Sequence, residues 1–213
     1  MISGLFSPSG TREYRRYRKV GMELNHKIID ALLDRGMIEE AARALGLGGK
    51  NRELVLDSED DLSVLMDFAL YELRRQGRTL VERYQQETGG SNAIERELLA
   101  GMVKAQMGLF QVEDMAAQQY HLILRSLGEE ERSITLTDIN FSQTVANGLI
   151  VFFRPIELGR FTMTSGIAFV FPPVMEQTLS RRWAREWKNA SSAKRYADFF
   201  KLSKRKGLDI RYL

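Results

Sequence analysis

The 213-residue sequence contains no cysteine. This absence excludes disulfides, thiolate metal ligands and a cysteine nucleophile, and it argues against a small secreted scaffold. Histidine is also scarce, because His26 and His121 are the only two and neither has a neighbour at metal-ligand spacing. We therefore predict no metal site and no cofactor, and we assign no catalytic residue.

Long apolar runs are missing as well. Uninterrupted apolar stretches reach only five residues, as at 149–153, whereas a membrane helix needs roughly 20. The first residues lack the basic segment and apolar stretch of a signal peptide. The hydrophobic fraction of 44% and the charged fraction of 28% are typical of a globular chain. We expect a soluble, cytoplasmic protein without a membrane partner.

Known catalytic and nucleotide-binding motifs are incomplete. The stretch 46–50 looks like a phosphate loop, but the motif needs glycine where Ala44 stands and Ser or Thr where Asn51 stands. The acidic run 57–61 lacks the ligand spacing and central glycine of a calcium loop and suits a first helical turn better. No Gly-x-Ser-x-Gly elbow is present. The sequence does not decide whether the protein is an enzyme, but the missing motifs favour a non-enzymatic role.

The first part of the chain, residues 1–106, has helical periodicity. Apolar residues recur at three- and four-residue steps and predict several helices. Gly36 is expected to end the first of them, Ser58 to cap the third, and Thr79 with Glu82 to form a capping box. The predicted helices cover 11–36, 37–45, 59–75, 79–87 and 92–106, with a lone strand or extended link at 53–57.

Residues 107–173 have strand-like alternation instead. No helix in this region is long enough for a crossover, so we predict antiparallel pairing in a small sheet or barrel. Ser165 and Gly166 are expected to form a hairpin turn. The predicted strands cover 109–113, 120–124, 134–138, 149–156, 161–164 and 167–171.

The last region, residues 174–213, is predicted to contain helices over 174–188 and 192–204. The first of these places Trp183 and Trp187 one turn apart. The predicted fold class is therefore α+β, with a helical N-terminal half, a small antiparallel β module and C-terminal helices that pack with the rest.

The net charge of +3 is unevenly distributed. From residue 181 onward there are 11 basic and three acidic residues, whereas the first 180 residues carry 20 basic and 25 acidic ones. A second basic cluster lies at 12–19. Lysine and arginine neutralise phosphates, and nearby aromatic rings can stack on bases. The candidate polyanion-binding residues are Arg12, Arg15, Arg16, Arg18, Lys19, Arg181, Arg182, Arg185, Lys194, Arg195, Lys204, Arg205 and Lys206.

A purely structural interpretation competes with this one. Tyr14 and Tyr17 fit the apolar stripe of the first helix, and the two tryptophans suit an anchor that fixes the tail to the body. The charges would then be solvated helix faces, or they would dock on acidic residues of the same chain or of a neighbour.

Our leading hypothesis is a non-catalytic interaction protein that self-associates or docks to another macromolecule through the β module and the basic tail. The first alternative is a nucleic-acid-binding accessory factor that uses the Arg/Lys-rich helices. The second is an enzyme whose site is assembled from scattered residues.

Overall fold

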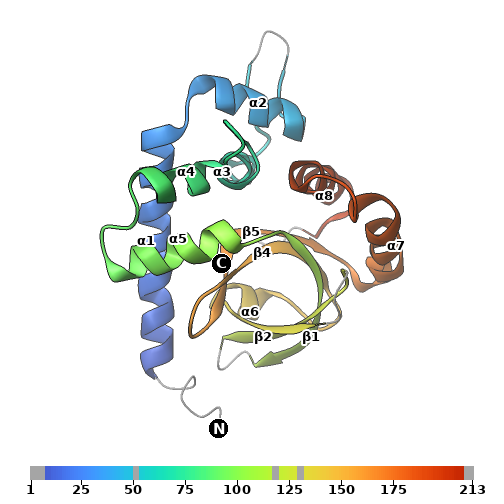
Figure 1. Cartoon of the computed structure of the whole chain (residues 1–213). Helices are drawn as coiled ribbons and strands as arrows, with labels where there is room; N and C mark the ends of the chain where they lie inside the picture. The colour runs from blue at the N-terminus through green and yellow to red at the C-terminus, as the bar shows by residue number, and fades with distance from the viewer. Residues whose placement is uncertain (1–7, 50–52, 117–119, 129–131, 209–213) are drawn as a thin grey trace.

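The computed structural model describes residues 8–49, 53–116, 120–128 and 132–208. Within these residues, five α-helices precede five strands and further helices follow them, so the fold is α+β as predicted (Figure 1). The N-terminal helices are α1 (Pro8–Leu32), α2 (Arg35–Leu45), α3 (Glu59–Tyr71), α4 (Leu80–Glu87) and α5 (Ala93–Lys104).

The structure confirms two of the three predicted helix ends. The Ser58 side chain accepts from the backbone N–H of Asp61, and Thr79 forms a capping box with Glu82. Gly36, however, does not end the first helix. The Asp34 side chain accepts the backbone N–H of Met37 and starts α2, so Gly36 lies in the first turn of the second helix.

Residues 53–57, predicted as a lone strand or an extended link, form no regular strand, so the strand alternative is wrong. The described part of that segment forms a single antiparallel bridge between Gly48 and Leu54. The helix that follows, α3, is buried on most of its circumference, as its composition predicts. Even its acidic residues Asp61 and Asp67 are buried.

The strands close into a barrel in the order β1-β2-β3-β5-β4. Four neighbouring pairs are antiparallel, but β3 and β5 run parallel. The expectation of purely antiparallel pairing is therefore wrong for this pair. Five strands cannot alternate in direction all the way around a closed barrel, so one parallel pair is unavoidable. The strands are β1 (Gly108–Ala116), β2 (His121–Ser126), β3 (Ser133–Thr137), β4 (Ile150–Glu157) and β5 (Thr162–Phe171).

Ser165 and Gly166 lie inside one continuous strand, β5, and not at a hairpin turn. Gly166 has a φ of 123°, a conformation that glycine adopts readily and that L side chains avoid. The register between β4 and β5 shifts at this point, between Phe153 and Pro155. The glycine therefore belongs to a strand irregularity that bends β5 beside Arg154.

The barrel interior is filled by side chains. Phe110, Leu124, Leu136 and Phe153 belong to one buried cluster there, and Phe141 joins it from the short helix α6 (Phe141–Thr144). All five are at most 2% exposed. The barrel is thus a packed core of the kind that small barrels form.

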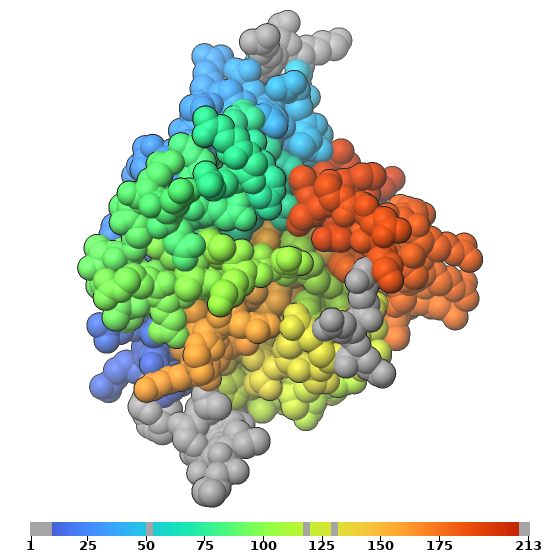
Figure 2. Space-filling model, viewed as in Figure 1, coloured from blue at the N-terminus to red at the C-terminus, as the bar shows by residue number. Residues whose placement is uncertain are grey.

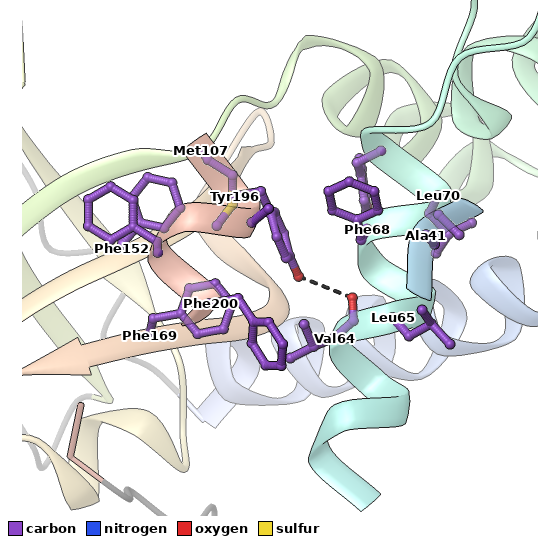
Figure 3. Packing of buried hydrophobic residues seen from close by; sticks show 14 of the residues in the cluster. Ala41, Val64, Leu65, Phe68, Leu70, Met107, Phe152, Phe169, Tyr196 and Phe200 are labelled. Atoms are coloured by element: carbon purple, nitrogen blue, oxygen red, sulfur yellow. Dashed lines mark hydrogen bonds between the residues drawn. The ribbon is translucent and has the colours of Figure 1, made fainter. Parts of the chain in front are cut away.

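The C-terminal helices cover the outside of the barrel (Figure 1). They comprise η3 (Pro173–Met175), α7 (Glu176–Arg182), the π-helical turn η4 (Trp183–Trp187) and α8 (Ser192–Lys206). The buried rings of α8 lie between α3 and the barrel, where the Tyr196 hydroxyl donates to the Val64 carbonyl at 3.4 Å (Figure 3). One hydrophobic cluster thus includes residues from the helical half, the strands and the tail.

None of the helices in the described ranges is both long and apolar enough to cross a membrane.

Candidate functional site

The predicted polyanion-binding residues lie on two separate surfaces. One is the N-terminal half of α1, and the other is formed by α7, η4 and α8 on the opposite side of the molecule (Figures 1 and 2). The fold therefore does not bring the 13 residues together into one patch.

On α1, an arginine stripe formed by Arg12, Arg15 and Arg16 is exposed. These three side chains form no ion pair with any described residue, while Lys19 beside them lies 3.9 Å from Glu23. The three- and four-residue spacing places the stripe and Lys19 on one side of the helix.

The aromatic residues interleaved with the stripe point inward. Tyr14 and Tyr17 are buried and make edge-to-face contacts with Phe161. The Tyr17 hydroxyl donates to Glu97 Oε2 at 2.6 Å, and this hydrogen bond raises the pKa of Tyr17 to about 12. These rings are part of the core, and base stacking on them is excluded by their burial.

Arg18 turns away from the stripe and toward the barrel. Its Nη1 donates to the Thr164 carbonyl at 2.6 Å, and its Nη2 donates to the Thr164 hydroxyl at 2.9 Å. The Asp138 carboxylate lies 3.5 Å from the same Nη2. Arg18 therefore anchors α1 to β5, and its charge is already compensated.

In the tail, several candidate cations bind acidic residues of the same chain. Arg182 contacts Glu186 at 2.9 Å, and Lys194 contacts Asp198 at 2.7 Å. These two pairs are solvated helix-face pairs, which contribute little to stability. Arg195 is held differently: its guanidinium lies 5.6 Å from the centroid of the Trp183 ring.

Lys204 connects the tail to the acidic run that precedes α3. Its Nζ lies 2.6 Å from Asp61 Oδ1 and 3.6 Å from Asp57 Oδ2. Asp61 is 1% exposed and also accepts the backbone N–H of Asp57. The acidic run thus caps α3 and binds the tail.

Arg181, Arg185, Arg205 and Lys206 are exposed and have no ion-pair partner among the described residues. The tryptophans near them are buried, as the anchor interpretation predicts. Trp187 additionally donates through Nε1 to Asp198 Oδ2 at 3.0 Å.

The remaining motif residues show no assembled chemistry. His121 shares a hydrogen bond with Thr137 at 3.1 Å, and burial lowers its pKa. His26 is exposed on α1. The described residues contain no group of three or more histidine or acidic side chains able to hold a metal ion. Lys50 of the glycine-rich stretch lies outside the described residues.

Sequence reasoning missed a cavity of about 170 Å³ between α1, α3, α5, β4 and the bent part of β5. Its walls are mainly apolar and include Met102, Ile156 and Met163. Polar groups line another part of it, where Asn25 and Tyr71 contribute. The cavity therefore has both apolar and polar lining.

A buried charged pair lies next to this cavity. Arg154 of β4 donates through Nη2 to Glu72 Oε1 at 2.5 Å and through Nη1 to the Ala105 carbonyl at 3.1 Å. Its guanidinium also lies 4.2 Å from the centroid of the Tyr71 ring. Arg154 and Glu72 are 2% and 7% exposed, so each depends on the other for compensation of its charge.

Asp67 of α3 belongs to the same buried region. Burial raises its pKa, while the Arg154 charge and the Ser165 hydroxyl act to lower it. Burial likewise raises the pKa of Tyr71 well above its ordinary value. Both effects follow from the cost of a charged form away from water.

Two sequence signals could have indicated this region. Arg154 interrupts an otherwise apolar strand, and Asp67 lies in the most apolar helix. Charged residues at such positions are seldom buried without a partner. The pairing of Arg154 with Glu72, 82 residues apart, could not be read from local patterns.

No match to this chain was found among curated proteins or solved structures. Residues 9–213 match the model of a family of unknown function, DUF7986, and the chain therefore belongs to this family.

Proposed function

We propose that this is a non-catalytic cytoplasmic interaction protein that docks to an acidic macromolecule, with the arginine stripe of α1 as the main contact. The observation that supports the proposal is the exposure of Arg12, Arg15 and Arg16 without a carboxylate partner among the described residues.

Electrostatics favours this stripe over the tail. The positive end of the α1 dipole lies near Pro8, and the stripe falls within the first turns of the helix. In the tail, by contrast, Lys204 is used to bind α3 and Arg182 lies over the Trp187 ring at 4.5 Å. The tail cations that lack an ion-pair partner among the described residues would form a secondary contact or a surface for self-association.

A nucleic-acid-binding accessory factor is the second candidate. The three guanidinium groups of the stripe, which have no carboxylate partner in the described part of the chain, favour it, since each can neutralise a phosphate. Because the neighbouring aromatic rings are buried, contact would be made with the backbone and without base stacking. This form of the proposal predicts binding that is independent of base sequence and steeply dependent on salt.

The proposal is tested by a pull-down with the full-length chain and two variants. The stripe variant carries Arg12→Ala, Arg15→Ala and Arg16→Ala; the control variant carries Arg181→Ala, Arg185→Ala and Lys206→Ala, which removes the same charge from the tail. We expect a partner that the wild type and the tail variant retain and the stripe variant loses. A partner retained by the stripe variant, or a chain that is monomeric by ultracentrifugation and captures nothing, contradicts the proposal.

A further inference from the structure

The cavity beside α1 has the size of a small-ligand site. Its volume of about 170 Å³ is close to that of an engineered cavity of about 150 Å³ that binds benzene. Met22, at its lining, is 60% exposed. A flexible, unbranched methionine at this position gives a small molecule a route inward.

Besides Ser165 Oγ, two buried polar atoms lie at this cavity without a hydrogen-bond partner among the described residues. They are the Tyr71 hydroxyl, on a side chain that is 7% exposed, and Asn25 Oδ1. The phenol can donate a hydrogen bond, and the amide oxygen can accept one. Buried groups of this kind are normally satisfied by a protein group, an ordered water or a ligand.

The charges around the cavity are already compensated. Arg18 is paired with Asp138, and Arg154 is paired with Glu72. Burial also keeps the Tyr71 phenol protonated by raising its pKa. A charged ligand would lose its hydration and gain no free countercharge, which disfavours it.

We propose that this cavity binds a small neutral molecule with an apolar body of about one aromatic ring and a hydroxyl or primary amide head. The head accepts from the Tyr71 hydroxyl and donates to Asn25 Oδ1, while Met102, Ile156 and Met163 contact the apolar body. This site goes beyond the proposed docking function and does not use the arginine stripe, so either proposal can fail alone.

Methionine methyl NMR of the full-length chain tests the site, since Met22, Met102 and Met163 line it. The probes are benzyl alcohol, toluene and benzoate, which share a ring and differ in the head group. We expect saturable shifts of these methyl signals with benzyl alcohol, and affinity at least about fivefold higher than for toluene or benzoate, the ratio expected from about 1 kcal/mol of hydrogen bonding.

Two substitutions should change ligand binding in the cavity without unfolding the protein. At Gly21, an added Cβ would have Leu98 Cδ1 as its nearest described neighbour, at 4.0 Å, and leucine is a better helix former than glycine. Gly21→Leu should therefore fill the cavity, remain folded and abolish the shifts. Tyr71→Phe should lower the affinity for benzyl alcohol to that for toluene and leave the affinity for toluene unchanged. Tyr84 is another buried tyrosine and lies away from the cavity. Tyr84→Phe is therefore the matched control and should change neither affinity.

Several results would overturn the inference. Absence of saturable shifts in the folded wild type would mean that the cavity holds only water. Tighter binding of benzoate than of benzyl alcohol would refute a neutral ligand. Unchanged benzyl alcohol affinity in Tyr71→Phe, or retained binding in Gly21→Leu, would refute the assigned contacts.

Discussion

The ring of Phe199 in α8 stacks on the ring of Phe152 in β4, with centroids 3.8 Å apart and planes at 9°. Both side chains are fully buried. The contact joins the basic tail to the barrel and makes α8 part of the shared core. The described aromatic residues of the tail are all buried and are therefore structural, so any binding by the tail would depend on its exposed charges.

Phe199→Ala should lower the free energy of unfolding by about 3–5 kcal/mol, because it removes a fully buried ring and leaves a cavity. Urea denaturation followed by circular dichroism measures this change. Val174→Ala, at a side chain that is 85% exposed, is the control and should change stability by less than about 0.5 kcal/mol. A loss below about 1 kcal/mol for Phe199→Ala would show that α8 is not packed as described.

Breaking the buried pair of Arg154 and Glu72 should be costly. Arg154→Met leaves the Glu72 carboxylate buried without its partner, and we expect a loss of about 3–5 kcal/mol. Replacing both residues by methionine removes both charges and should recover most of that loss. Denaturation of the two single variants and the double variant gives the coupling energy. Additive losses would indicate that the two groups do not interact.

Asp67 should give a distinctive pH dependence. Burial raises its folded pKa above the ordinary 3.8, so its contribution to stability is fully present below pH 3.8 and is lost as the pH rises through the raised pKa. Asp67→Asn removes the ionisable group and therefore this loss of stability at higher pH. The free energy of unfolding of the variant minus that of the wild type should therefore increase from pH 4 to pH 8.

Asp198→Asn is the matched contrast for this experiment. Burial acts to raise the pKa of Asp198, but hydrogen bonds from Lys194 and Trp187 outweigh it and the pKa is lowered. Its stabilising contribution is present above pH 3.8 and is lost as the pH falls through the lowered pKa. The free energy of unfolding of Asp198→Asn minus that of the wild type should therefore decrease as the pH rises through the acid range. This trend is opposite to the one expected for Asp67→Asn. A flat difference for Asp67→Asn would contradict the raised pKa.

The features predicted from sequence were those set by local chemistry. The Ser58 cap, the capping box of Thr79 and Glu82 and the strand alternation depend on residues a few positions apart. The structure differs from the prediction at Gly36 and Gly166 because glycine permits several conformations, and neighbouring contacts decide among them. At Gly36, the Asp34 cap decided the outcome.

The candidate sites were less predictable for a different reason. Exposure of the arginine stripe follows from helix periodicity, but the inward turn of Arg18 depends on Asp138 and Thr164, more than 100 residues away. The cavity likewise requires α1, α3, α5, β4 and β5 to converge. Such non-local arrangements have no short sequence signature.

The salt dependence of polyanion binding tests the central claim most directly. Fluorescence anisotropy would follow the full-length chain with a labelled DNA duplex and with a labelled poly-glutamate peptide over a salt series. The comparison uses whichever probe the wild type binds. For this probe, we expect the stripe variant, Arg12→Ala/Arg15→Ala/Arg16→Ala, to reduce the slope of log affinity against log salt concentration by roughly 2–3. The tail variant Arg181→Ala/Arg185→Ala/Lys206→Ala should keep most of the wild-type slope. Binding of neither probe at low salt, or an equal slope for wild type and stripe variant, would contradict docking through α1.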